Sequence, residues 1–160
     1  SIEQHRAIKE SVPNYLMVKS NAGTVGCTPE GCKALSEFVN VFIGEHKSAE
    51  LGPLGAVGCC SSMIYWNPRV TLDLWQHVHD GDWQHVEAVC ERLSNLIAFL
   101  HGEYVERGFT DTAFDRMGGR ASGFLQTSLR SRGPYTSATQ KDVDQLRAWY
   151  GEHFPEMLEV

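Results

Sequence analysis

The residue best placed to do chemistry is Lys19, which closes a short apolar run that begins at Tyr15. Pro13 and the turn at residues 21–23 bound this run, so it predicts a buried strand with Lys19 at its C-terminal end. Side chains alternate along a strand, so Met17 and Lys19 share a face, which we expect to point into a crowded apolar centre. Desolvation there would lower the pKa of Lys19 from about 10.4 toward neutrality. A drop of about three units corresponds to roughly 4 kcal/mol.

Such an amine attacks a ketone and forms an imine. The alternative is an exposed and inert lysine. Two further strand ends carry polar side chains, Glu45-His46 and Ser61-Ser62, and the carboxyl ends of parallel strands are where such sheets form their sites. Glu45 and His46 could move protons or belong to a solvated loop. Ser61 could hydrogen-bond a ligand or satisfy backbone groups of its turn.

These strand ends belong to a regular alternation of elements. Thr28-Pro29 and Asn67-Pro68 are helix-start signals, and Ser137 and Gln140 have capping-box spacing. An irregular stretch is expected around Gly118 and Gly123. The expected strands are 15–20, 39–43 and 56–60, and the expected helices are 2–11, 29–38, 47–54, 67–79, a long one from 83 that stops at Gly108, 112–117 and 138–154.

Strand-helix alternation with short connections predicts an α/β fold with parallel strands. A doubly wound sheet and a barrel both fit this order. Three parallel strands alone would leave apolar edges unpaired, which natural proteins avoid, so we expect further strands to cover them.

Composition narrows the class of protein. The chain has 160 residues, 42% hydrophobic and 21% charged, as in an ordinary globular domain. A net charge of -6 with no basic stripe argues against nucleic-acid binding. No apolar stretch approaches the roughly 20 residues that cross a bilayer, and no signal sequence opens the chain, so we expect no membrane partner.

The five cysteines show no repeated Cys-x-x-Cys pair, which argues against a disulfide framework or a zinc knuckle. Reduced thiols and a cytoplasmic location are expected. A metal site would have to use His77, His79 and His85, but the first two point in different directions on one helix, so no metal site is expected.

Three segments carry a resemblance to a known family: YLMVKS, NVFIGE, and GAVGCCSSMIYWNPRV leading into WQHVHDGDWQHVEAVCERL. Their order is similar to the second half of the class I pyruvate aldolases, which include dihydrodipicolinate synthase and N-acetylneuraminate lyase. Within that superfamily, SSMIYWNP and SLRSRGPYTSAT resemble the hydratase-aldolases that cleave aromatic benzylidenepyruvates. Dihydrodipicolinate synthase usually has an acidic residue after the lysine, whereas Ser20-Asn21 stands here.

The resemblance implies the C-terminal half of a (β/α)8 TIM barrel, with residues 1–108 as the barrel half and 109–160 as a helical extension. It implies Lys19 as the Schiff-base residue for pyruvate or another 2-oxo acid, an aldehyde as second substrate, and no cofactor. The implied substrate-binding residues are Ser20, Asn21, Glu45, His46, Ser61, Ser62, Tyr65 and Trp66, the last two as an aromatic wall or as subunit contacts.

A complete barrel takes about 250 residues, and the family's proton-shuttling tyrosine belongs to earlier strands. The resemblance therefore implies an N-terminal half-barrel polypeptide, which is either a separate partner or a part from which this chain has been cut, and a homo-oligomer of the complete barrel. Two alternatives stay open: a dihydrodipicolinate synthase-like synthase or sugar-acid dehydratase or aldolase, and a non-catalytic half-barrel subunit.

Overall fold

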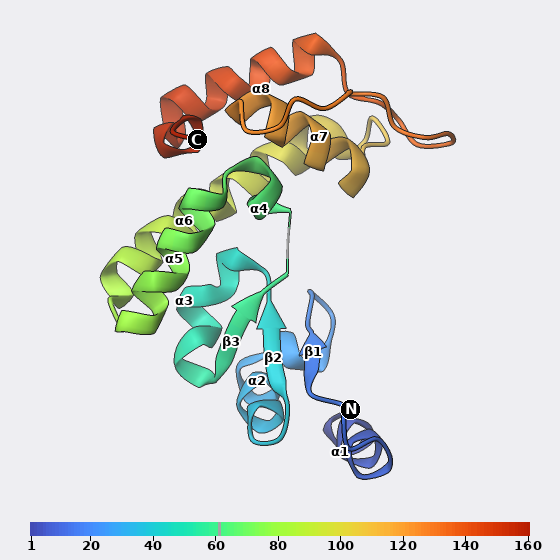
Figure 1. Cartoon of the computed structure of the whole chain (residues 1–160), viewed down its shortest axis with the longest axis vertical. Helices are drawn as coiled ribbons and strands as arrows, with labels where there is room; N and C mark the ends of the chain where they lie inside the picture. The colour runs from blue at the N-terminus through green and yellow to red at the C-terminus, as the bar shows by residue number, and fades with distance from the viewer. Residues whose placement is uncertain (61) are drawn as a thin grey trace. The chain divides into compact units, whose positions relative to one another are not determined.

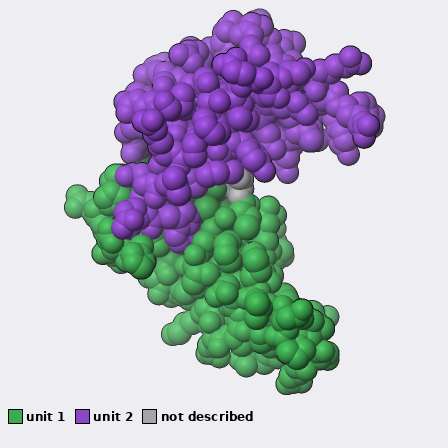
Figure 2. Space-filling view, viewed as in Figure 1, with its two compact units in different colours: residues 1–61, 77–90 green, residues 62–76, 91–160 purple. Residues whose placement is uncertain are grey.

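The computed structural model describes residues 1–60 and 62–160 of the chain. They form two compact units (Figure 2): the first unit comprises Ser1–Ser61 and His77–Cys90, and the second unit Ser62–Gln76 and Glu91–Val160. Helices α5 (Pro68–Asp80) and α6 (Trp83–Leu100) each contribute residues to both units. The expected division at 1–108 and 109–160 stays a prediction.

The first unit is built on a three-stranded parallel sheet in the order β1-β2-β3 (Figure 1). The strands are β1 (Met17–Lys19), β2 (Asn40–Ile43) and β3 (Ala56–Cys59). All three were expected, and the parallel arrangement is confirmed, although each strand is shorter than the pattern predicted. Within the described residues, β1 and β3 each pair on one side only.

Short helices connect these strands. They are α1 (Ile2–Ser11), α2 (Pro29–Ser36) and α3 (Ser48–Leu51), with 3₁₀ turns η1 (Val25–Cys27), η2 (Glu45–Lys47) and η3 (Gly52–Leu54). Thr28 caps α2 as expected, because its hydroxyl accepts a hydrogen bond from the Gly31 N–H at 3.1 Å. The buried core joins one face of the sheet to α2 and α3 and consists of Cys32, Leu35, Val39, Val41, Ile43, Leu51 and Ala56.

The opposite face of the sheet is open. Val18 and Val41 are register partners and turn toward the core, so Met17 and Lys19, one residue to either side of Val18, turn away from it. Met17 is 44% exposed and Val57 is 54% exposed. One face of this sheet is packed against helices, and the other face exposes hydrophobic side chains. A sheet of this kind is half of a layered structure, because its second face has no layer packed on it among the described residues.

The second unit is helical. It contains α4 (Met63–Trp66), α7 (Asp111–Ser122), α8 (Gln140–His153), a π-helical turn η4 (His101–Val105) after α6, and a final 3₁₀ turn η5 (Pro155–Leu158). The apolar stripe expected on α6 is confirmed as core. Its buried members in this unit, with those of α7 and α8, are Leu93, Leu96, Leu100, Tyr104, Met117, Leu146 and Tyr150.

Helix α7 corrects the expectation of an irregular stretch near Gly118. The helix continues to Ser122 because Gly118 and Gly119 are buried and form its contact surface for α4. A Cβ added at Gly118 would lie 2.5 Å from the Trp66 ring, and one at Gly119 would lie 2.8 Å from the Tyr65 carbonyl oxygen. The close approach of the two helices offsets the usual cost of glycine within a helix.

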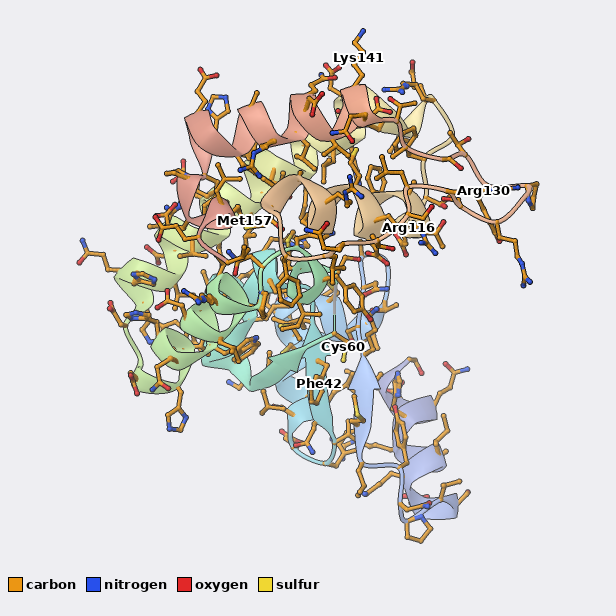
Figure 3. The ribbon with its side chains drawn as sticks, turned by 45° about the horizontal axis from the view of Figure 1, so that its top comes forward. Phe42, Cys60, Arg116, Arg130, Lys141 and Met157 are labelled. Carbon is orange, nitrogen blue, oxygen red and sulfur yellow. The ribbon has the colours of Figure 1, made fainter. Side chains whose placement is uncertain are left out.

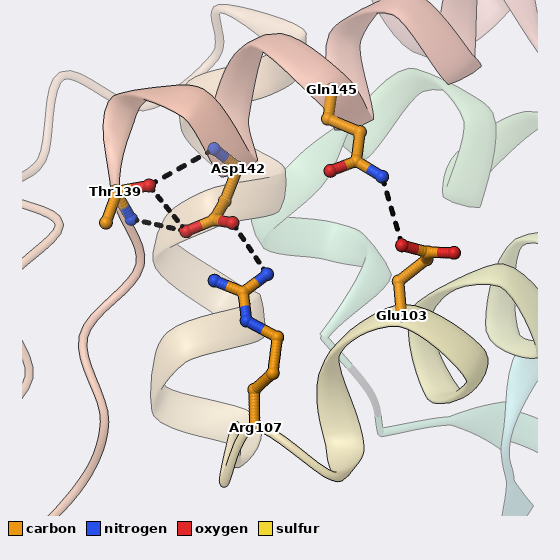
Figure 4. A network of polar contacts seen from close by, with 5 residues as sticks. All are labelled: Glu103, Arg107, Thr139, Asp142 and Gln145. Carbon is orange, nitrogen blue, oxygen red and sulfur yellow. Dashed lines mark hydrogen bonds and ion pairs between the residues drawn. The ribbon is translucent and has the colours of Figure 1, made fainter.

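The start of α8 also differs from the sequence expectation. The capping box is formed by Thr139 and Asp142, not by Ser137 and Gln140. The Asp142 carboxylate accepts hydrogen bonds from the Thr139 N–H at 2.8 Å and from Arg107 at 2.8 Å (Figure 4). Ser137 instead accepts from the Ser131 N–H at 2.9 Å. Both motifs have the spacing of a capping box, and the additional ion pair with Arg107 favours the second.

This carboxylate should make the second unit sensitive to acid. Burial alone would raise the pKa of Asp142, but hydrogen bonds from Arg107 and Thr139 hold the pKa below its usual value. A lowered folded-state pKa contributes stability above the unfolded-state value of about 3.9, and this stability is lost as the pH falls through the lower folded-state pKa.

We therefore expect Asp142→Asn to lower the free energy of unfolding by about 1–2 kcal/mol at neutral pH. Chemical denaturation from pH 7 to pH 2 measures this, and the difference from the parent should shrink below about pH 4. Asp144→Asn is the matched control, because Asp144 lies on the same helix and bonds only the exposed Gln140 at 2.8 Å. Equal losses in the two variants would contradict a special role for Asp142.

Candidate active site

Lys19 lies at the C-terminal end of β1, as the sequence predicted, and its register partner on β2 is Phe42. Its side chain is exposed. The expectation of a crowded apolar centre around it is therefore wrong for the chain by itself. The physical reason is that β2 is the one strand paired with β1 among the described residues, so no second wall encloses the amine.

Phe42 and Gly58 form the apolar surface next to Lys19 on the open face. A β-bulge places Val57 as an extra residue, so Phe42 pairs with Gly58. A Cβ added at Gly58 would lie 2.5 Å from Cε1 of Phe42, so the ring lies directly across the glycine. Figure 3 labels the Phe42 side chain on β2 and the Cys60 side chain, which follows β3. The missing Cβ at Gly58 thus leaves the space that the Phe42 ring occupies, in the row beside Lys19.

The two residues after Lys19 have structural contacts. Ser20 is buried, its N–H donates to the Phe42 carbonyl at 2.7 Å, and its hydroxyl packs against Gly26. By strand alternation Ser20 faces away from Lys19. The Asn21 carbonyl accepts from the Thr24 N–H at 3.0 Å and closes a turn. These contacts place neither Ser20 nor Asn21 on the face of the sheet that carries Lys19. Their expected roles in substrate binding stay predictions.

Glu45 and His46, at the end of β2, are not a solvated loop. Glu45 is buried, and its carbonyl accepts from the Cys90 thiol at 3.4 Å. Burial, and then the charge of Lys47, lowers the pKa of His46. The imidazole is therefore neutral at physiological pH and able to accept a proton. After Lys19, His46 is therefore the second side chain of the first unit that could take part in a reaction at a strand end.

The remaining predicted residues belong to the second unit, apart from Ser61, which lies outside the described residues. Ser62 precedes α4 and hydrogen-bonds Asp115, whose pKa burial raises. Tyr65 is 50% exposed, whereas Trp66 is only 3% exposed and packs on Gly118. The prediction of a two-residue aromatic wall is therefore corrected: Trp66 is core, and Tyr65 alone keeps an accessible ring.

The five cysteines form no disulfide bond, and burial raises the pKa of Cys32 and Cys90. Among the described residues, no helix combines the length and the apolar character needed to cross a membrane.

A polar cluster that the sequence pattern did not predict lies at the tip of the α5–α6 hairpin. The rings of His77 and His85 stack with centroids 3.7 Å apart, and His77 Nδ1 lies 3.0 Å from Oδ2 of Asp82. The histidines were considered as if on one helix. The signal that could have found the cluster is the Asp80-Gly81 turn, because a reversal there brings residues eight apart together.

Comparison with solved structures identifies the fold. Dihydrodipicolinate synthase from Aquifex aeolicus aligns with a TM-score of 0.73 at 20% identity, over 95% of this chain and 50% of that chain. YagE, a prophage protein of the dihydrodipicolinic acid synthase family from E. coli K12 in complex with pyruvate, aligns with a TM-score of 0.76 at 16% identity, over 95% and 50%. PhdJ bound to substrate intermediate aligns with a TM-score of 0.60 at 19% identity, over 99% and 59%.

The chain thus spans about half the length of the structures it matches. No protein-family profile matches the sequence, and no curated protein matches it. The likeness confirms the expected fold class, the C-terminal half of a TIM barrel.

His46 provides a pH test of this site. We expect its imidazole to titrate at a lower pH in the folded protein than in urea, because burial disfavours the charged ring. Lys47→Gln should raise the folded-state pKa by removing a like charge, but leave it below the usual value because burial is the larger cause. Histidine side-chain NMR across pH 4–8 at constant salt would measure both, taking about 6.5 as the reference.

The lowered pKa of His46 also makes the stability of the fold depend on pH. A lowered histidine pKa contributes stability above about pH 6.5, and this stability is lost as the pH falls through the folded-state value. An imidazole that titrates identically in the folded and unfolded protein would contradict the burial described for His46.

Proposed function

We propose that Lys19 is the Schiff-base nucleophile of a class I pyruvate aldolase whose barrel is completed by a second half-barrel. The observation that carries this proposal is the position of Lys19 at the C-terminal end of the first of three parallel strands. Two observations support it: the strand-end location that such barrels use for catalysis, and the likeness, over half their length, to a dihydrodipicolinate synthase and to a protein of that family in complex with pyruvate.

The chemistry follows from an amine at this position. Nζ of Lys19 attacks the keto carbon of a 2-oxo acid, water leaves, and an iminium forms. For a benzylidenepyruvate, water first adds across the carbon-carbon double bond and gives the imine of a 4-hydroxy-2-oxo acid. A base then takes the 4-hydroxyl proton, the C3–C4 bond breaks, its electron pair moves into the iminium to give an enamine, and the aldehyde departs. Protonation and hydrolysis then release pyruvate and regenerate the amine. The covalent imine is the electron sink, so the proposed reaction uses no metal or organic cofactor.

Barrel closure would supply the environment that the chain alone lacks. Strands pairing with the free edge of β1 would cover Met17 and Lys19 and place a second wall opposite Phe42. Taking the ammonium out of water favours the neutral, nucleophilic amine. His46, neutral and at the next strand end, is the group of this half that would carry protons.

For the second substrate we propose an aryl aldehyde, which makes the enzyme a hydratase-aldolase. The exposed ring of Tyr65 and the SSMIYWNP and SLRSRGPYTSAT segments support this choice. The five free cysteines favour a cytoplasmic location, and the complete barrel is proposed to form a homo-oligomer. Turnover of aryl aldehydes against aliphatic semialdehydes separates this function from a synthase.

The open sheet predicts a partner. Met17 on β1 is 44% exposed and Val57 on β3 is 54% exposed, and among the described residues both strands pair on one side only, so we expect the chain alone to aggregate. Native material should contain a polypeptide that supplies the remaining strands, detected by size-exclusion chromatography with intact mass spectrometry. A well-behaved monomer of 17.9 kDa would contradict this expectation.

Covalent trapping tests the nucleophile. Treating the complete assembly with pyruvate and borohydride should add the reduced pyruvyl group to Lys19, mapped by peptide mass spectrometry. Lys19→Arg should abolish trapping and lower turnover at least about 10³-fold, because the replacement keeps the charge but cannot form the imine. Lys33→Arg, at a position on α2, is the matched control and should trap as the parent does.

Two outcomes would count against the proposal. Label on other lysines but not on Lys19 would remove its central residue. A complete assembly in which nothing is trapped would favour the second candidate, a non-catalytic half-barrel subunit, for which the exposed side chain of Lys19 already argues in the chain alone.

A further inference from the structure

We propose that the hairpin of α5 and α6 carries a binding site for a divalent transition metal, formed by Asp73, His77 and His85. Each of these residues offers one ligand atom, and the three atoms all lie within 4.8 Å of one another. The proposed site uses none of the residues of the Lys19 chemistry, so it stands independently of the proposed function.

Helix geometry places the first two ligands. Asp73 and His77 are four residues apart on the continuous helix α5, so their side chains project from the same face one turn apart. A carboxylate and an imidazole at this spacing can reach a common ion without any change in the backbone.

The turn between the helices places the third ligand. Gly81 adopts φ +73°, and the Asp82 N–H donates to the His77 carbonyl at 3.0 Å, which reverses the chain. Helix α6 then begins at Trp83 and carries His85 back beside His77. The stacked rings, 3.7 Å apart, are close enough that rotation about the side-chain bonds turns both toward one ion.

Asp82 supplies a second, independent feature of a metal site. One of its carboxylate oxygens lies 3.0 Å from His77 Nδ1, and the other accepts from the His85 N–H at 3.3 Å. A carboxylate that hydrogen-bonds one ring nitrogen fixes the orientation of the ring, the arrangement that orients metal-binding histidines in many proteins. The carboxylate is itself fixed by the start of α6, so it orients the ring without being a ligand.

The donor set selects the class of ion. Two imidazole nitrogens and one carboxylate oxygen suit Zn²⁺ and its neighbours Co²⁺ and Ni²⁺, whereas Mg²⁺ and Ca²⁺ prefer all-oxygen sites. Ligand distances of about 2.0–2.2 Å in a tetrahedral site require donors roughly 3.4 Å apart, so ligand atoms that lie within 4.8 Å of one another must approach by up to about 1.4 Å. All three ligands are at least partly exposed, which permits that movement and leaves a fourth position for water.

Calorimetric titration of the complete, metal-free protein with Zn²⁺ tests the site. We expect one ion per chain, and at least about 10-fold weaker binding in His77→Gln, His85→Gln and Asp73→Asn. Asp82→Asn keeps all three ligands and should weaken binding about 10-fold by releasing the His77 ring. His79→Gln is the matched control, because His79 is exposed on the same helix and lies outside the cluster.

Substitution by Co²⁺ gives a second readout that does not involve activity. A tetrahedral site with two nitrogen ligands should produce visible absorption bands that the His77 and His85 variants lose, while circular dichroism confirms that they stay folded. The proposal is overturned if the parent binds no ion more tightly than these variants do, or if His79→Gln weakens binding as much as they do. Neither result bears on trapping at Lys19.

Discussion

The architecture of the first unit depends on the parallel pairing of β1 with β2, because that register decides which side chains face the helices and which face outward. With Val18 opposite Val41 in the covered layer, Lys19 is placed opposite Phe42 in the open one. A slip by one residue would bury the ammonium among the aliphatic side chains of α2 and α3. The hydrophobic core therefore fixes the chemical face of the sheet indirectly, by holding the other face.

The sequence pattern could predict those features that depend on local interactions. Short apolar runs bounded by glycine and proline located all three strands, and Thr28-Pro29 and Asn67-Pro68 located helix starts, because these signals act locally. Strand order and parallel direction followed from the alternation of elements. The resemblance on the strand-end lysine and the segment after β3 was confirmed at the level of the fold.

The features that the sequence pattern failed to predict all depend on tertiary contacts. Gly118 looked like a helix breaker because nothing in the sequence announces the Trp66 ring that packs on it. Two capping boxes were equally possible at the last helix, and a distant arginine, Arg107, favours the later one. Exposure of Lys19 could not be derived from its strand, since it depends on which strands are present on the far side of β1.

One small feature, the missing side chain at Gly58, sets the relief of the open face. The bulge at Val57 pairs this glycine with Phe42, and the aromatic ring occupies the space that a Cβ at Gly58 would need. Because that Cβ would lie 2.5 Å from the ring, alanine at this position would force the ring to move. The surface in the row beside the lysine thus depends on a residue without a side chain.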